Sequence, residues 1–225
     1  MKPSFKPKTK LEKFGLEILN LLVENFSQSY FVGGMVRDLL THHNIKDIDI
    51  ATEAVPEEVM NILKQNHIKY DSKYKNFGII LPKRNKLTLE IATFRKESYK
   101  NTRYPKIDFT KSIKTDSKRR DFTINSLYFK PNFNIIDYYK GLNDLKTKTI
   151  RFIGSPSLKI KQDSLRIVRA LRFSLDLKFK IEKNSKNAIE KNFLLIKNLT
   201  ETKLKKEIAK SKNKTKLKKI ILKNT

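Results

Sequence analysis

Apolar residues near the start of the chain recur at the spacing of an amphipathic helix. Within residues 11–26 they are Leu11, Phe14, Ile18, Leu21, Leu22 and Val23, and this set predicts one helix. A second helix is expected from Pro56 to about Gln65, because proline and the two glutamates that follow it favour the first helical turn. Residues 1–10, which contain lysines and prolines, are expected to be disordered.

Short apolar runs between these two helices predict strands. The first is residues 30–32, directly before a pair of glycines. The second is the sequence DIDIA, residues 47–51. Side chains alternate along a strand, so Asp47 and Asp49 would share one face while the two isoleucines share the other.

Two further strands are expected after the second helix, at residues 77–82 and 86–94, with a basic turn between them. The second of these would place Glu90 beside the DIDIA strand. Residues 95–118 are mostly polar, and they are expected to form a long loop.

The next segment, RRDFTINSLYF (residues 119–129), is expected to be a helix with Phe122, Ile124 and Leu127 on its apolar side. Residues 135–154 read as strand, turn and strand, with the turn at Gly141 and Asn143. Asp137 and Asp144 are interpreted as structural residues of this segment.

Apolar spacing in the last third of the chain predicts helices. One helix is expected to carry QDSLRIVRALRF, residues 162–173, with arginines on one side and aliphatic residues on the other. Residues 184–198 contain a further apolar set, and Thr200 is suited to cap a helix that begins at Glu201.

Charge adds a prediction about partners. The formal net charge of the 225 residues is +27 and the pI is about 10.1, which favours a polyanionic partner. RNA is favoured over an anionic membrane surface, because the sequence shows no lipidation signal and no long amphipathic basic helix. Without cysteine, an export signal or a long apolar run, the chain is expected to be soluble and cytoplasmic.

Candidate chemistry is concentrated between residues 31 and 52. Two carboxylates on one strand face repel each other, and a divalent cation between Asp47 and Asp49 would relieve that repulsion. Gly33 and Gly34 would let the backbone approach a ligand closely. The helix start after them and the guanidinium of Arg37 both favour an anion. The stretch therefore predicts a triphosphate beside metal.

The motifs GGMVRD (33–38) and KDIDIAT (46–52) resemble the nucleotidyltransferase signature of the tRNA CCA-adding enzyme and bacterial poly(A) polymerase family, class II. The segments 119–129 and 162–173 resemble later motifs of that family, in the family's order, so the resemblance covers about residues 28–210. It implies an α/β nucleotidyltransferase head like that of polymerase β, with a small mixed sheet and flanking helices. The head would span residues 11–154. A helical neck-like segment with a basic tail would span residues 155–225.

The resemblance also implies a reaction and its residues. Asp47 and Asp49 would bind two Mg²⁺ ions, and Glu90 resembles the third acidic residue of the family. The 3′-hydroxyl of a tRNA or other RNA would attack the α-phosphate of CTP or ATP, and pyrophosphate would leave. Charge on the phosphates would be offset by Gly33, Gly34, Arg37, Arg119 and Arg120, with Asp121 holding one of the arginines.

Base selection is implied for the helix at residues 162–173. Asp163 and Arg166 would read the base, and Arg169 and Arg172 would support the pocket or the phosphates. Gln162 stands where the family usually has glutamate, which makes this selectivity less secure. The element Arg103–Tyr104–Pro105 resembles part of a flexible loop in members that add adenylate, and it weakly favours ATP as a substrate.

Three functions stay open at this point. The chain could add C and A to tRNA 3′ ends. It could run the same chemistry with narrower output, either A alone or a poly(A) tail. It could instead be an inactive or partial RNA-binding subunit of a split enzyme that needs a second chain for the body and tail helices, since family members typically continue beyond the neck. The lysines of residues 201–225, ten against two glutamates, would form either a solvated tail or a surface for the RNA backbone.

Overall fold

The computed structural model describes residues 5–99, 105–132 and 134–224. These residues form two compact units. Unit 1 takes in residues up to 99, then 105–120 and 125–139. Unit 2 takes in residues 121–124 and 140–224. The predicted division after residue 154 concerns the family's domains and stays a prediction, whereas the compact units divide after Tyr139.

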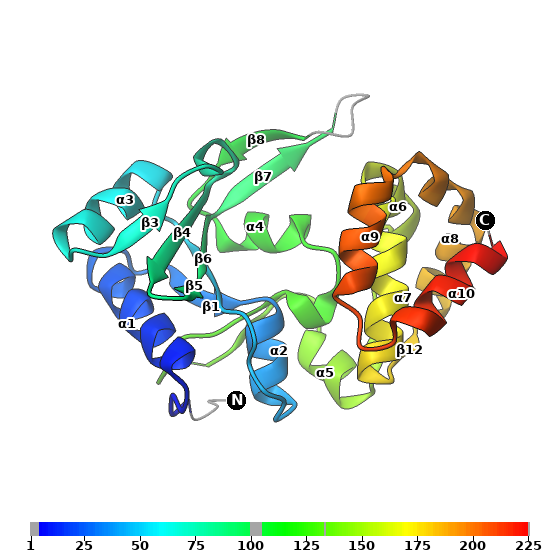
Figure 1. Ribbon diagram of the computed structural model, residues 1–225, viewed down its shortest axis with the longest axis horizontal. Helices are drawn as coiled ribbons and strands as arrows, with labels where there is room; N and C mark the ends of the chain where they lie inside the picture. The colour runs from blue at the N-terminus through cyan, green and yellow to red at the C-terminus, as the bar shows by residue number, and fades with distance from the viewer. Residues whose placement is uncertain (1–4, 100–104, 133, 225) are drawn as a thin grey trace. The chain divides into compact units, whose positions relative to one another are not determined.

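A mixed sheet forms the centre of unit 1 (Figure 1), with the strand order β1-β2-β6-β4-β3 and β5 paired to β4. Its strands are β1 (Ser29–Val32), β2 (Asp49–Thr52), β3 (Lys69–Asp71), β4 (Ile79–Arg84), β5 (Leu87–Thr88) and β6 (Glu90–Thr93). Strands β2 and β6 are parallel and the other pairs in this sheet are antiparallel. This confirms the predicted α/β class with a small mixed sheet.

Helices α1 (Lys10–Asn25) and α3 (Pro56–Gln65) lie next to each other and contact strands of this sheet. Both occur where the apolar spacing predicted a helix. Ile48 and Ile50 are buried in the core, and Gly15 of α1 lies against Ile48. The helix α2 (Gly34–Leu40) follows β1 directly. The sheet and its helices thus fix the segment that carries the aspartates.

The polar residues 95–118 are not a long loop as predicted. Strands β7 (Arg95–Ser98) and β8 (Lys106–Phe109) form an antiparallel hairpin, and α4 (Ile113–Arg119) follows. The element at 103–105 lies outside the described residues except for Pro105. The pattern was misread because β7 and β8 pair only with each other and bury few apolar residues.

The predicted helix over residues 119–129 is also wrong. Helix α4 ends at Arg119, a 3₁₀ turn η2 covers Thr123–Asn125, and β9 (Leu127–Tyr128) pairs with β10 (Ile136–Asp137). Phe122 and Ile124 belong to the core of unit 2, whereas Tyr128 belongs to a cluster in unit 1. The segment therefore changes from helix to 3₁₀ turn to strand along its length, and its apolar side chains are divided between the two cores.

Unit 2 is largely helical, with one short parallel ladder between β11 and β12. Its elements are α5 (Gly141–Lys146), β11 (Thr149–Ile150), α6 (Pro156–Gln162), α7 (Leu165–Leu177), β12 (Lys180–Ile181), α8 (Lys183–Lys191), η3 (Phe193–Asn198), α9 (Glu201–Ala209) and α10 (Lys214–Asn224). The expected turn at Gly141 is the helix α5. The expected single helix over 162–173 is interrupted at Asp163, which has extended backbone angles and ends α6.

None of the helices in the described part of the chain combines the length and the apolarity needed to cross a bilayer.

Candidate functional site

The two aspartates of DIDIA lie at the start of β2, in the middle of the sheet. Asp47 is exposed and Asp49 is half-buried, while Ile48 and Ile50 are 1% and 0% exposed. The predicted alternation of faces is therefore confirmed, although the strand itself begins at Asp49. Asp49 pairs with Val32 of β1 on one side and with Glu90 of β6 on the other.

Glu90 thus lies on the neighbouring strand, as predicted. It is in register with Asp49, and its backbone N–H donates to the carbonyl of Ile48 at 3.1 Å. Among the described residues, no group of three or more His, Cys, Asp or Glu side chains is arranged to hold a metal ion. The metal-binding role of Asp47 and Asp49 and the catalytic role of Glu90 stay predictions.

Gly33 forms the wall next to Asp49. Its φ angle is +73°, which L residues rarely adopt, and a Cβ atom at this position would lie 2.8 Å from Oδ2 of Asp49. Gly34 begins the seven-residue helix α2, and a Cβ there would lie 3.3 Å from Nη2 of Arg37. Gly33 therefore permits a close approach of the backbone to the carboxylate of Asp49, and Gly34 a close approach to the guanidinium of Arg37.

This donor set suits a divalent cation. Mg²⁺ prefers carboxylate oxygens and keeps several waters, so a site needs few protein ligands and open space around them. Asp47 is exposed, and Asp49 faces a backbone that carries no side chain at Gly33. The residues present therefore fit Mg²⁺ held by Asp47 and Asp49.

Arg37 has its guanidinium tied to other residues of unit 1. Nε and Nη2 lie 2.9 and 2.8 Å from Oδ1 of Asp38, and Nη1 donates to Oδ1 of Asn125 at 2.9 Å. The residue is 8% exposed. Arg37 therefore joins α2 to η2. No pattern in the sequence points to Asn125 as this partner, because it lies 88 positions further along the chain. Phosphate binding by Arg37 stays a prediction.

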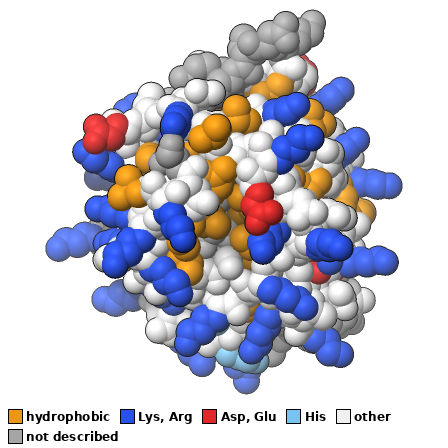
Figure 2. Space-filling model, turned by 90° about the vertical axis from the view of Figure 1, so that its right-hand side faces the viewer, with side chains coloured by type: hydrophobic (Ala, Val, Ile, Leu, Met, Phe, Trp, Pro, Cys, Tyr) orange, Lys and Arg blue, Asp and Glu red, His pale blue; other side chains and the backbone are white. Residues whose placement is uncertain are grey.

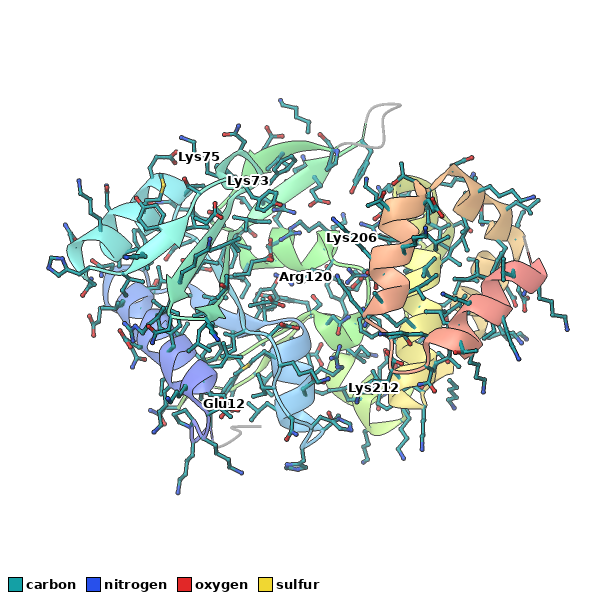
Figure 3. All side chains as sticks on the ribbon, viewed as in Figure 1. Glu12, Lys73, Lys75, Arg120, Lys206 and Lys212 are labelled. Carbon is teal, nitrogen blue, oxygen red and sulfur yellow. The ribbon has the colours of Figure 1, made fainter. Side chains whose placement is uncertain are left out.

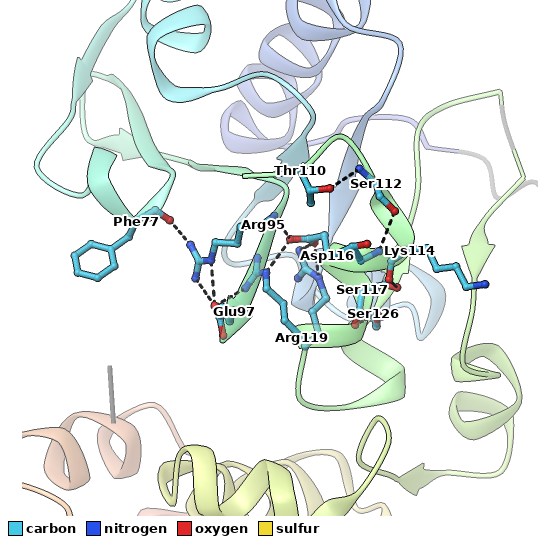
Figure 4. A network of polar contacts seen from close by, with 12 residues as sticks. Phe77, Arg95, Glu97, Thr110, Ser112, Lys114, Asp116, Ser117, Arg119 and Ser126 are labelled. Atoms are coloured by element: carbon cyan, nitrogen blue, oxygen red, sulfur yellow. Dashed lines mark hydrogen bonds and ion pairs between the residues drawn. The ribbon is translucent and has the colours of Figure 1, made fainter. Parts of the chain in front are cut away.

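Asp116 of α4 is the partner of both predicted phosphate-binding arginines (Figure 4). Nε of Arg119 donates to Oδ1 at 2.8 Å, and Nη2 of Arg120 donates to Oδ2 at 3.1 Å. Asp121 was expected to hold one of these arginines, and this expectation is wrong because Asp121 pairs with Arg169 instead. Helical spacing could have revealed Asp116, since it lies three and four positions before the two arginines.

The pKa values of Asp116 and Tyr128 follow from these contacts and from burial. Burial alone would raise the pKa of Asp116, but the guanidiniums of Arg120 and Arg119 outweigh burial and lower that pKa to about 2. The phenol of Tyr128 donates to Oδ2 of Asp116 at 2.7 Å. Burial, the first cause, raises the pKa of Tyr128 well above its ordinary value, so the phenol stays protonated.

The remaining predicted residues lie in unit 2. Asp121 accepts from Nη2 of Arg169 at 2.6 Å. Burial would raise the pKa of Asp121, but Arg169 and then Arg166 lower it below its ordinary value. Nε of Arg169 is buried and has no hydrogen-bond partner among the described residues. Arg172 donates to Oε1 of Glu207 at 2.7 Å.

Arg166 is positioned by the segment before its own helix. Nη1 donates to the carbonyl of Lys159 at 2.8 Å and to Oε1 of Gln162 at 3.2 Å. Gln162, the residue that departs from the family, therefore still holds Arg166, though through a neutral acceptor. Asp163 ends α6 just before α7, and its Oδ1 accepts from the N–H of Leu165, the first residue of α7, at 3.2 Å. The base-selecting roles of Asp163 and Arg166 are not tested by these contacts.

Asp144 and Asp137 have the structural roles that were expected. The buried carboxylate of Asp144 accepts from Oγ1 of Thr123 at 2.7 Å and from Nε of Arg151 at 3.1 Å. Asp137 accepts from the N–H of Tyr139 at 3.1 Å.

Lysines and arginines are spread over the face of the molecule drawn in Figure 2, where acidic side chains are few. In α9, α10 and the segment between them nearly all lysines are exposed. Among them are Lys206 on α9 and Lys212 just after it, both labelled in Figure 3. This distribution suits a polyanion, because each phosphate neutralised by a lysine releases counterions.

Comparison with known proteins identifies relatives. The poly A polymerase head domain family matches residues 29–151. The CCA-adding enzyme of Lactobacillus helveticus (strain DPC 4571) is 36% identical over 197 residues, which cover 87% of this chain and 48% of that protein.

Solved structures agree with this match. The Bacillus stearothermophilus CCA-adding enzyme in complex with CTP aligns with a TM-score of 0.77 and 30% identity, over 89% of this chain and 49% of that one. The Thermotoga maritima CCA-adding enzyme complexed with tRNA aligns with a TM-score of 0.75 and 27% identity, over 96% of this chain and 51% of that one. The chain spans about half the length of these relatives. By its sequence match and its fold, the chain belongs to the poly A polymerase head domain family, which confirms the resemblance seen in its motifs.

Proposed function

We propose that the protein is a template-independent RNA nucleotidyltransferase that adds CMP and AMP, from CTP and ATP, to the 3′ end of tRNA. One observation carries this proposal. Asp49 lies between β1 and Glu90 of β6 and faces the side-chain-free wall at Gly33, all within the residues that match the poly A polymerase head domain family. A carboxylate set against a glycine turn suits a metal-bound triphosphate.

The proposed roles in unit 1 follow from the geometry of its residues. Asp47 and Asp49 would hold two Mg²⁺ ions, which when bound lower the pKa of the attacking 3′-hydroxyl and offset phosphate charge. Gly33 leaves room for the phosphates next to Asp49. Arg119 and Arg120, both fixed by Asp116, offset charge on the departing pyrophosphate. The new bond joins the 3′-oxygen to the α-phosphorus, and the bond from that phosphorus to the pyrophosphate oxygen breaks.

In unit 2 we propose that Asp163 and Arg166 select the base. Arg166 presents a planar fork of donors and is fixed by Lys159 and Gln162, which gives it the defined orientation that base recognition needs. The buried Nε atom of Arg169 has no hydrogen-bond partner in the described part of the chain, and Arg169 and Arg172 would support the bound nucleotide or its phosphates.

The substrates are supported by the relatives and by charge. The B. stearothermophilus relative was solved with CTP and the T. maritima relative with tRNA. A net charge of +27 and the exposed lysines of α9 and α10 favour a polyanion. The cytoplasm, where these substrates are found, is the location we propose for the reaction. A second candidate, addition of A alone or of a poly(A) tail, is favoured by the name of the matching family.

The test is the incorporation of each labelled nucleoside triphosphate, with magnesium, into tRNAs that end before the CCA, after the first C and after the second C. CTP followed by ATP addition is expected. Addition of ATP alone, or of long adenylate tails, would establish the second candidate. No incorporation by folded protein would refute the proposal for this chain alone and favour an RNA-binding subunit that works with a second chain.

Matched variants make the assay specific. Asp47→Ala should abolish incorporation without loss of folding, because Asp47 is exposed and makes no contribution to the core. Asp71→Ala is the control, since Asp71 on β3 forms only an exposed pair with Lys83 and a turn hydrogen bond. Full activity of the Asp47 variant would refute the assignment of the metal site.

A further inference from the structure

Asp116 is enclosed by donors that come from three elements. It is 0% exposed, and its Oδ1 accepts from Nε of Arg119 and from the backbone N–H of Arg95, at 2.8 and 3.3 Å. Its Oδ2 accepts from Arg120, through Nη2 at 3.1 Å, and from the phenol of Tyr128 at 2.7 Å. One carboxylate thus joins β7, α4 and β9, and Figure 4 shows its contacts with Arg95 and Arg119.

A second carboxylate, Glu97 of β7, holds Arg119 from another direction. Its Oε1 lies 3.4 Å from Nη1 of Arg119 and 3.0 Å from Nη2 of Arg95. Asp116 and Glu97 therefore occupy Nε and Nη1 of Arg119. The third nitrogen of Arg119, Nη2, makes no hydrogen bond to any residue that the structure describes. A guanidinium fixed at two nitrogens is oriented, and its third nitrogen remains available to a ligand oxygen.

Three guanidiniums lie close together in this cluster. Those of Arg119 and Arg120 contact Asp116, and those of Arg95 and Arg119 contact Glu97. Burial and then the like charge of Arg119 lower the pKa of Arg95, although Glu97 is next to it. Guanidiniums packed this closely repel one another, and a bound anion would reduce that repulsion. The cluster therefore suits a phosphate chain.

We propose that Asp116 is the positioning residue of the triphosphate site, orienting Arg119 and Arg120 toward the phosphates without touching the substrate itself. This inference rests on the proposed function, in which the two arginines offset the charge of the leaving pyrophosphate. Because the carboxylate contacts both side chains at Nε, a change at Asp116 moves both guanidiniums together.

The decisive variant is Asp116→Asn. The amide keeps the shape of the side chain, but it replaces one acceptor oxygen by a donor and removes the negative charge. With both guanidiniums freed from the carboxylate that they share, though still in contact with Glu97 and Tyr128, the affinity for inorganic tripolyphosphate should fall at least tenfold. In the incorporation assay kcat/KM should fall about a hundredfold, the size of effect that a misplacement of about 1 Å produces.

Tripolyphosphate binding, measured by calorimetry on the whole chain, separates this inference from the proposed function. The measurement needs no RNA and no turnover, so the inference can hold even if no nucleotide is incorporated. If the unaltered protein does not bind tripolyphosphate, the inference is overturned, whatever the incorporation assay gives. If Asp116→Asn is folded and binds tripolyphosphate as the unaltered protein does, it is also overturned.

Two further comparisons exclude a merely structural role. In a background that carries Arg119→Ala and Arg120→Ala, Asp116→Asn should reduce binding no further, because the residues act as one unit. Additive losses would overturn the inference. Glu53→Gln is the matched control in unit 1: its carboxylate accepts from Gln28 and Ser27 but from no arginine, and tripolyphosphate binding should not change.

If Asp116→Asn does not fold, Tyr128→Phe decides the question. The phenol donates to Asp116 and accepts from Nε of Arg120 at 3.0 Å, so its removal loosens the carboxylate while leaving every charge in place. A loss of tripolyphosphate affinity of a few-fold is expected. Unchanged affinity would overturn the inference.

Discussion

Replacing Gly33 by alanine should disable the site through Asp49, with little effect on the rest of the fold. The added Cβ atom would lie 2.8 Å from Oδ2 of Asp49, a separation that real Cβ atoms essentially never show. The contact involves a short carboxylate on a central strand, paired on both sides by β1 and β6. The backbone of β2 cannot move away without breaking those ladders, so the carboxylate itself must rotate.

Gly33→Ala should have a modest effect on folding stability and a large effect on the rate of incorporation. The backbone at Gly33 has φ +73° and ψ −139°, a region almost restricted to glycine, so alanine costs about 1–3 kcal/mol of folding free energy. For a chain of this size that lowers the melting temperature by roughly 2–4 °C per kcal/mol. Displacement of a metal ligand by about 1 Å should lower the rate of incorporation about a hundredfold.

Gly154 supplies a matched control. Its φ angle is +72°, close to that of Gly33, but a Cβ there would have no heavy atom within 4 Å. Gly154→Ala should therefore show the backbone cost of about 1–2 kcal/mol and no loss of incorporation. Melting temperature and CTP incorporation would be measured for both variants. If Gly33→Ala keeps the activity of Gly154→Ala, the glycine wall is not required by the site and the reasoning is refuted.

Three other outcomes are expected. Tyr128→Phe should lower the free energy of unfolding in urea by about 1–3 kcal/mol, since it removes a buried hydrogen bond to Asp116; no change would contradict that contact. The pKa of Asp116 falls from 3.8 to about 2 on folding, so its stabilisation is complete above about pH 4 and is lost as the pH falls towards 2. Between about pH 4 and pH 2 the free energy of unfolding of Asp116→Asn should therefore fall by less than that of the unaltered protein. Acid titrations followed by circular dichroism would measure this, and equal losses would contradict the lowered pKa. Gln162→Glu should hold Arg166 by an ion pair. If this strengthens the interaction that orients Arg166 by about 1 kcal/mol, discrimination against UTP and GTP should improve roughly fivefold in competition assays. Unchanged discrimination would show that Gln162 already suffices.

The centre of unit 1 could be predicted because its signals are local. The alternation of DIDIA placed Asp47 and Asp49 on one face, and the run containing Glu90 was expected on the neighbouring strand. Both expectations follow from the two-residue period of a strand and from burial of the isoleucines between the acids. The structure adds the register, in which Asp49 pairs with Glu90. No sequence pattern encodes that register, because it depends on two chain segments 41 positions apart.

The arginine contacts could be predicted only in part. Arg119 and Arg120 were recognised, but the adjacent Asp121 was expected to hold one of them. The chain leaves α4 directly after Arg119, so Asp121 enters the core region of unit 2 and meets Arg169. Asp116 stays on the helix, one turn before the arginines, and meets both. Sequence proximity therefore suggested the wrong carboxylate, because a helix end changes which residues are neighbours in space.

The positive charges of the chain are of two kinds: arginines held in place by side-chain contacts, and lysines exposed to solvent. Arginines at the predicted site residues are held by carboxylates or amides, as in the pairs Arg37–Asp38, Arg169–Asp121 and Arg172–Glu207. Lysines of α9 and α10 are mostly exposed. An oriented guanidinium recognises a phosphate or a base at a defined place, whereas a solvated ammonium attracts any polyanion and is screened by salt. Recognition of the nucleotide should thus depend on the few fixed arginines, and attraction of RNA on the many exposed lysines. Raising the salt concentration should weaken RNA binding far more than it weakens the binding of tripolyphosphate.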